Sequence, residues 1–170
     1  MLGVTRSSAG SVMKYTRFEE LPVWQAAMGL AVGIMALTSR PTFAGQSSLR
    51  SQIERATVSV SNNIAEGLEG ATTQELLTFL YIARGSAGEV RSMLCLLEQL
   101  PEFHNLQSEI SELKSAAEAI SRQLRGWADS LQNSPIKGQR YLTEKTRKME
   151  RTRQERDQFL GQLRKIRAED

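Results

Sequence analysis

The chain has 170 residues, of which 40% are hydrophobic, so it is long enough to bury one core and too apolar for an intrinsically disordered protein. A single cysteine, Cys95, excludes an intrachain disulfide framework and favours a reducing, cytoplasmic compartment. The net charge of +3 is uneven: residues 136–170 hold 11 Lys/Arg against 6 Asp/Glu, which gives +5, whereas residues 1–135 hold 11 against 13, which gives −2.

Residues 1–17 are expected to form a disordered N-terminal segment, since the first twelve are rich in Ser and Gly without periodicity and could be a leader. The apolar run over residues 26–37 is too short for a membrane span, which needs about 20 residues. Glu19 and Glu20 precede it where a signal peptide would be basic. We therefore expect a buried helix, and no membrane partner.

The first two helices are bounded by proline, serine and glycine. Pro22 suits a first helical turn and Pro41 cannot continue a helix, which predicts a helix over residues 22–39. The second helix is expected to begin with Ser47 or Ser48 as its N-cap and to run to Glu66, where Gly67 and then Gly70 stop it. One stripe at helical spacing identifies its buried face: Leu49, Ile53, Ala56, Val60 and Ile64.

The third helix is predicted from Thr72 or Thr73, because Thr72 and Glu75 have the spacing of a capping box, to about Leu100. Gly85 and Gly88 each cost about 1 kcal/mol inside a helix, which suggests close approach of another helix. The fourth helix is expected over residues 106–133, before Pro135.

Four amphipathic helices joined by short loops pack as antiparallel neighbours. The sequence therefore predicts an all-α fold, an antiparallel up-down-up-down four-helix bundle over residues 18–134, followed by a basic helical arm over residues 135–170.

Phosphate contacts are the expected use of this arm, with RNA as the partner. Its basic residues are Lys137, Arg140, Lys145, Arg147, Lys148, Arg151, Arg153, Arg156, Arg164, Lys165 and Arg167. The alternative is a solvated helix whose charges pair internally, for example Glu144 with Lys148 and Glu155 with Arg151. We favour binding because eleven basic residues accompany only six acids.

Residues for catalysis are scarce, so we expect no enzyme, no metal site and no cofactor. One histidine and one cysteine cannot form a zinc site or a Cys-His dyad, and nucleotide-binding loops and di-iron motifs are absent from the sequence. His104 is expected in a surface loop, and Cys95, in an apolar run, in the core.

A polar stripe follows the second helix at three- to four-residue spacing and is the main candidate for a structural polar network; its members are Gln52, Arg55, Ser59, Asn62 or Asn63, and Glu66. The bland interpretation is a solvated helix face. If the turn is centred near Gly70, however, Arg55 lies opposite Gly85 and one turn from Glu89. The stripe therefore predicts a partly buried Arg55–Glu89 pair that fixes the register of the two helices.

The sequence also resembles a bacterial family: the four-helix-bundle proteins encoded in 23S rRNA intervening sequences, together with the accessory variability determinant (Avd) of diversity-generating retroelements. The resemblance covers residues 18–133 and is carried by Phe18, Leu21, Val23, Trp24 and Gln25; by Leu49, Gln52, Arg55 and Ala56; by Ser59 and the run Asn63, Ile64, Ala65, Glu66 and Gly67; and by Phe79, Leu80, Ile82, Ala83, Gly85, Ser86 and Glu89.

This resemblance implies a ring-like homopentamer whose basic surface contacts nucleic acid. In the Avd branch it implies an accessory protein that binds a reverse transcriptase and its template RNA. The chain departs from the pattern in two respects, because its bundle region is not basic and it carries the arm after Pro135. We expect a homo-oligomer, because the chain has more apolar residues, including Trp24 and Trp127, than the core of one bundle can bury. The alternative function is a structural or protein-interaction scaffold with no retroelement role.

Overall fold

The computed structural model describes residues 17–70 and 72–133, together with Thr152 and Arg156. Its helices are α1 (Pro22–Thr38), α2 (Ser47–Glu69), α3 (Thr73–Gln99) and α4 (Gln107–Gln132). Short 3-10 helices precede α1 (Phe18–Glu20), α2 (Pro41–Phe43) and α4 (Pro101–Leu106). The predicted all-α class is confirmed, since the described ranges contain no strand. The expected N-terminal segment before residue 17 and nearly all of the expected arm lie outside the described residues.

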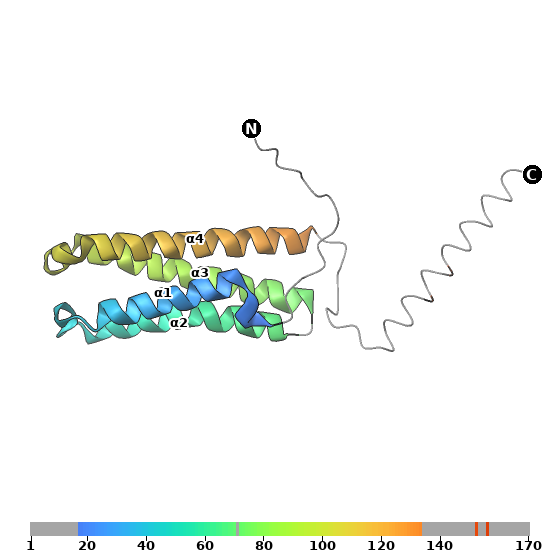
Figure 1. The fold of residues 1–170 in the computed structure, drawn as a ribbon, viewed down its shortest axis with the longest axis horizontal. Coiled ribbons are helices and arrows are strands. Elements are labelled where there is room, and N and C mark those ends of the chain that lie inside the picture. Colours follow the sequence, from blue (N-terminus) through green and yellow to red (C-terminus); the bar gives the residue numbers. More distant parts are fainter. Residues whose placement is uncertain (1–16, 71, 134–151, 153–155, 157–170) are drawn as a thin grey trace, which may run out of the picture.

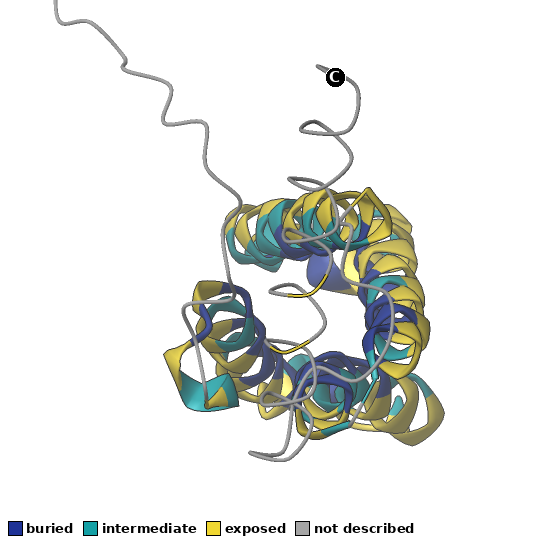
Figure 2. Cartoon of the chain, turned by 90° about the vertical axis from the view of Figure 1, so that its right-hand side faces the viewer, coloured by how far each residue is buried: buried dark blue, intermediate teal, exposed yellow. Residues whose placement is uncertain are grey.

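The four helices form a bundle in which sequence neighbours are also spatial neighbours (Figure 1). α1 packs on α2 and α4, and α3 packs on the same two helices. α1 and α3 therefore occupy opposite corners of the bundle. Seen along its axis, buried residues line the inside and exposed residues the outside (Figure 2), which is the distribution that the helical periodicity predicts.

One apolar core runs through the bundle, and its largest fully buried side chains are Phe103, Ile34, Leu37, Ile53, Ile64, Leu68, Leu76, Leu80, Leu94, Leu97, Ile110 and Ile120. Phe43 and Phe103 close the end of the bundle that carries the α1–α2 and α3–α4 connections, with ring centroids 4.9 Å apart. Trp24 and Trp127, which we expected to exceed the capacity of the core, are partly buried and pack against it.

The residues predicted to begin α1 and α3 are confirmed, whereas the N-cap predicted for α2 is not. Pro22 occupies the first turn of α1, and the capping box of α3 is formed, because Thr72 Oγ1 accepts from the Glu75 amide at 3.1 Å and Glu75 Oε2 accepts from the Thr72 amide at 3.0 Å. The serine cap predicted for α2 was wrong. The helix already includes Ser47, and Gln46 precedes it without a capping side-chain bond.

Gly67 does not end α2, contrary to the prediction. The helix continues to Glu69, and a Cβ on Gly67 would lie 2.9 Å from Cβ of Phe79 and 3.1 Å from Leu76 Cδ1. At Gly33, between α1 and α4, a Cβ would lie 2.6 Å from Leu113 Cδ2, the end of a side chain that can turn aside. Gly67 therefore allows a close contact between α2 and α3 at a position where a larger residue would push the helices apart.

Gly85 and Gly88 do not mediate close packing inside the chain, which corrects the second glycine prediction. Both are exposed, and a Cβ on either would have nothing within 4 Å. None of the described helices is long and apolar enough to cross a membrane.

Candidate functional site

A chain of hydrogen bonds links the polar stripe of α2 to α3. Asn63 Nδ2 donates to Ser59 Oγ at 3.0 Å, Ser59 and Ser86 share a bond of 2.9 Å between their hydroxyls, and Ser86 Oγ donates to the Ile82 carbonyl at 3.1 Å. Ser86 is buried and Ser59 half-buried. Small hydroxyl side chains therefore connect the two helices where the sequence predicted a charged pair.

The predicted Arg55–Glu89 pair is not formed. Both side chains are exposed, and no ion pair joins them among the described residues. With α2 and α3 joined through Ser59 and Ser86, Arg55 faces solvent, where hydration competes well with an ion pair. Gln52 is also exposed and donates to Ser48 Oγ at 3.3 Å, so it belongs to a separate surface contact.

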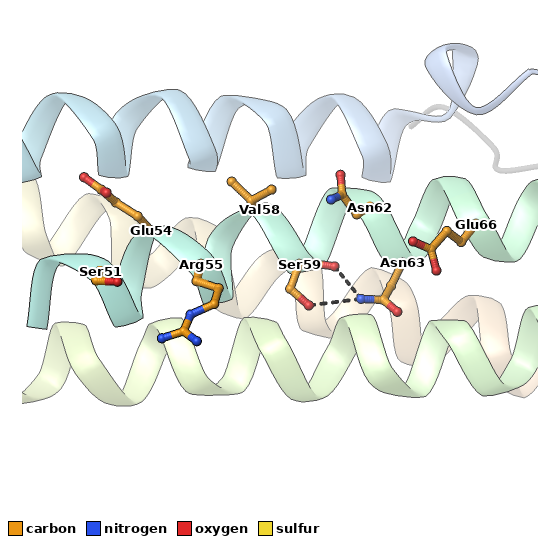
Figure 3. A pocket seen from close by; sticks show the side chains of 8 residues that line it. All are labelled: Ser51, Glu54, Arg55, Val58, Ser59, Asn62, Asn63 and Glu66. Atoms are coloured by element: carbon orange, nitrogen blue, oxygen red, sulfur yellow. Dashed lines mark hydrogen bonds between the residues drawn. The ribbon is translucent and has the colours of Figure 1, made fainter. Parts of the chain in front are cut away.

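Arg55 instead lies in a shallow groove of about 560 Å³ along the outer side of α2. Figure 3 shows its lining side chains between the ribbons of α1 and α3. They are Ser51, Glu54, Arg55, Val58, Ser59, Asn62, Asn63 and Glu66. The groove thus combines a guanidinium, two amides, two carboxylates and two hydroxyls, a set of groups suited to polar recognition.

Glu54 is the most strongly held group in this groove. Its Oε1 accepts from the Thr38 hydroxyl at 2.6 Å and from Arg50 Nε at 2.9 Å. The Thr38 bond, and secondarily Arg50, lower the pKa of the Glu54 carboxyl below its ordinary value. The Glu54 carboxylate on α2 therefore links this helix to Thr38 of α1.

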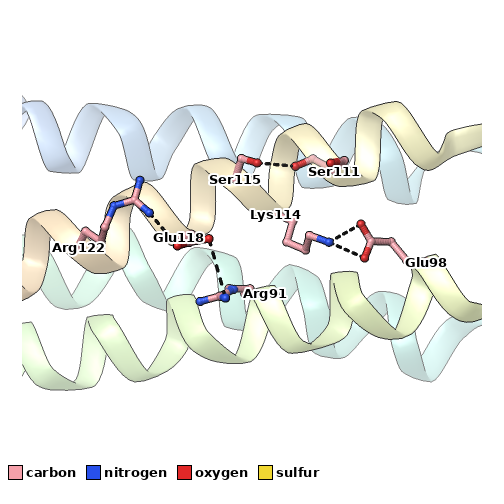
Figure 4. A network of polar contacts seen from close by, with 7 residues as sticks. All are labelled: Arg91, Glu98, Ser111, Lys114, Ser115, Glu118 and Arg122. Carbon is pink, nitrogen blue, oxygen red and sulfur yellow. Dashed lines mark hydrogen bonds and ion pairs between the residues drawn. The ribbon is translucent and has the colours of Figure 1, made fainter.

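Ion pairs connect α3 to α4 on another side of the bundle (Figure 4). Lys114 Nζ lies 2.6 Å from Glu98 Oε1, and this bond raises the pKa of Lys114. Glu118 lies between two arginines, at 2.8 Å from Arg122 and 3.8 Å from Arg91. The acids on this face therefore already neutralise part of its positive charge.

Eleven arm residues were predicted to contact phosphate: Lys137, Arg140, Lys145, Arg147, Lys148, Arg151, Arg153, Arg156, Arg164, Lys165 and Arg167. Only Arg156 is described, as a helical and exposed residue. The other ten lie outside the described residues, so their predicted role stays a prediction.

Exposed apolar side chains on two helices were missed by the sequence reasoning. On α1 they form a stripe of Met28, Val32 and Met35. On α3 Tyr81, Ile82 and Leu96 are exposed, with the charged residues Glu89 and Arg91 exposed between them. A signal was present, because none of the 17 residues of α1 is charged although a surface helix has one polar face.

Cys95 is a further exposed residue of α3. The sequence predicted it in the core, but its side chain is exposed, because the helix turns Leu94 and Leu97 inward instead. His104 is exposed in the 3-10 helix before α4, which confirms the prediction of a surface histidine.

Comparisons with known proteins agree with this architecture. A family model described as 23S rRNA-intervening sequence protein matches residues 19–126. A crystal structure of a protein of unknown function from the S23 ribosomal protein family of Bacteroides thetaiotaomicron is similar in fold, with a TM-score of 0.56 and 20% sequence identity, over 62% of this chain and 97% of that one. No curated protein matches the chain.

Proposed function

Since the chain belongs to the 23S rRNA-intervening sequence protein family, we propose that it is a non-enzymatic accessory protein that self-associates and binds RNA through its C-terminal segment. The observation that carries the RNA proposal is the separation of charge. Residues 136–170 have a net charge of +5, whereas residues 1–135 have −2. Cations gathered on one appendage neutralise phosphates and release counterions, which supplies most of the affinity of sequence-independent binding.

The resemblance to Avd extends this proposal to a partner and a stoichiometry. A reverse transcriptase that uses the bound RNA as template is the proposed protein partner, and five copies are the proposed assembly. A structural scaffold without RNA is the second candidate, and the exposed apolar stripe of α1 supports it, because uncharged exposed surface favours protein contacts.

Two matched full-length variants separate the arm from the bundle wall. The arm variant changes Lys145, Arg147, Lys148 and Arg151 to glutamine, and the wall variant changes Arg84, Arg91, Arg122 and Arg125 to glutamine. Each removes four positive charges. Fluorescence anisotropy with single-stranded and structured RNA is measured over a series of salt concentrations, and a chain truncated after Pro135 is measured beside them.

We expect the arm variant and the truncated chain to lose most of their RNA affinity. The slope of log K against log salt should fall by up to about 3 in the arm variant, because each phosphate contact contributes roughly 0.7 to 0.9. The wall variant should keep the original slope. RNA binding that survives in the truncated chain but not in the wall variant would place the site on the bundle. If no form binds RNA, the scaffold function replaces this proposal.

A further inference from the structure

We infer that this chain prefers single-stranded RNA to duplex RNA, because an unpaired base stacks on the exposed ring of Tyr81. This inference rests on the proposed RNA binding by the arm and adds a second contact, which carries no charge and depends on whether the bases are free. The exposure of Tyr81, the hydrogen bond that anchors it and its position beside the start of the arm support this assignment.

Tyr81 is the exposed aromatic residue of the described bundle. Its exposed fraction is 43%. The other aromatic side chains in the described ranges are buried or half-buried; they are Phe18, Trp24, Phe43, Phe79, Phe103 and Trp127. Every base has a π-face, so an accessible aromatic ring can stack on any of the four bases. Within the described ranges, Tyr81 is therefore the ring that is available to an RNA base.

A hydrogen bond between two helices holds this ring in place. Gln132 Nε2, in the last turn of α4, donates to the Tyr81 hydroxyl of α3 at 2.6 Å. A tyrosine side chain has only two torsions, and a bond at its tip restricts both. A base that packs on the ring therefore has little side-chain motion to suppress, which lowers the entropic cost of binding.

The surface on either side of Tyr81 leaves room for a base. Gly85, one turn further along α3, is exposed, and a Cβ there would have nothing within 4 Å. Thr78, one turn before Tyr81, is a small exposed residue. Asp129, near the end of α4, lies 3.7 Å from Arg125, which offsets its charge. A nucleotide can therefore approach the ring without meeting a bulky side chain at these positions or the uncompensated charge of Asp129.

The arm begins beside this ring. Gln132, which bonds Tyr81, is the last residue of α4, and Lys137, the first basic residue of the arm, follows five residues later. Five residues reach at most about 18 Å. An RNA strand whose phosphates contact the first cations of the arm can therefore place a nearby base on Tyr81. The bases of a duplex are already stacked on one another, so only an unpaired base has a free face for the ring.

Full-length variants at this position test the stacking. Tyr81→Ala removes the ring, and Tyr81→Phe keeps the ring without its hydroxyl. Ile82→Ala is the control, because it shortens the next exposed side chain of α3, which is 47% exposed. Fluorescence anisotropy is measured over a series of salt concentrations with single-stranded RNA, with duplex RNA of the same length and with a ribose-phosphate strand that lacks bases. Circular dichroism checks that each variant keeps its helices.

We expect Tyr81→Ala to bind single-stranded RNA about 5- to 150-fold more weakly at every salt concentration, which is the loss of one stacked base. The slope of log K against log salt should stay unchanged, because no phosphate contact is removed. Affinity for the duplex and for the strand without bases should equal that of the original chain. Tyr81→Phe and Ile82→Ala should keep most of the affinity for single-stranded RNA.

The outcomes separate this inference from the function on which it rests. An original chain that binds no RNA overturns both. If the original chain binds RNA and the folded Tyr81→Ala variant binds single-stranded RNA equally well, RNA binding stands and the stacking on Tyr81 is overturned. An equal loss of affinity for the strand without bases, or a smaller salt slope, also overturns it. Ultraviolet cross-linking of the original chain to single-stranded RNA that carries 5-bromouridine needs no substitution. It should attach RNA to Tyr81, and attachment confined to residues 136–170 would contradict the inference.

Discussion

Thr38, in the last turn of α1, donates its hydroxyl to the Glu54 carboxylate of α2 at 2.6 Å. Thr38 is 1% exposed, so this bond is shielded from water on the α1 side. Arg50 donates to the same carboxylate oxygen at 2.9 Å. The pair therefore ties α1 to α2 in addition to their apolar contacts.

Thr38→Val should lower the free energy of unfolding at pH 7 by about 1–2 kcal/mol, because it removes a hydrogen bond to a charged group while keeping the shape of the side chain. Urea denaturation measures this. Thr78→Val is the control, since Thr78 is exposed and its hydroxyl bonds only the Gln74 carbonyl of its own helix; it should change stability by less than about 0.5 kcal/mol.

The bond between Thr38 and Glu54 also predicts that the free energy of unfolding depends on pH. The pKa of Glu54 is lowered in the folded chain, so its contribution is complete above the ordinary glutamate value of 4.5 and is lost as pH falls below that value and through the folded-state pKa. Thr38→Val should therefore lose less stability than the original chain on acidification from neutral pH. Parallel acid sensitivity in the two proteins would show that the bond contributes nothing.

Arg55→Met should be nearly silent in thermal unfolding, within about 0.5 kcal/mol, because Arg55 is exposed and makes no ion pair with Glu89. Ser59→Ala should cost about 1 kcal/mol, since it leaves the buried Ser86 without its partner from α2. Calorimetry of both variants shows whether Arg55 or Ser59 holds α2 in register with α3. A large loss in Arg55→Met with none in Ser59→Ala would restore the charged pair.

Gly67→Ala and Gly85→Ala should have opposite effects on a single folded chain. Alanine at Gly67 would contact Phe79 at 2.9 Å, so we expect a loss of about 1–2 kcal/mol after the gain in helix propensity is deducted. Alanine at Gly85 meets nothing and should raise the free energy of unfolding of the monomer by up to about 1 kcal/mol. Denaturation at low protein concentration tests both, and a stabilised Gly67→Ala would contradict the close contact.

The sequence predicted the fold well because helix limits and buried stripes are encoded by neighbouring residues. Thr72 with Glu75 is a complete local signal, and the structure contains the corresponding capping box. Gly67 is different. Its neighbours in the sequence indicate a helix stop, whereas in the structure it makes room for Phe79 of the next helix. Such a contact becomes visible only when the helices are placed.

The candidate site was less predictable, since it depends on how far each helix is rotated about its axis. A rotation that turns Leu94 and Leu97 inward turns Cys95 outward, although all three belong to one apolar run. The same uncertainty affects Arg55 and Glu89, whose spacing allows a contact but does not require it. The separation of charge between residues 1–135 and 136–170, in contrast, can be counted from the sequence without knowing how the helices are rotated.

The exposed apolar stripe of α1 allows a test of the proposed self-association. Val32 is 64% exposed and Met28 38%, on a helix without a charged residue. Met28→Glu with Val32→Glu should reduce the mass measured by size-exclusion chromatography with light scattering, because carboxylates without a partner are costly to bury in a contact between copies. Gln123→Glu with Ser130→Glu, on exposed positions of α4, adds the same charge and should leave the mass unchanged. An oligomer of unchanged mass in the folded α1 variant would show that the copies associate through another face.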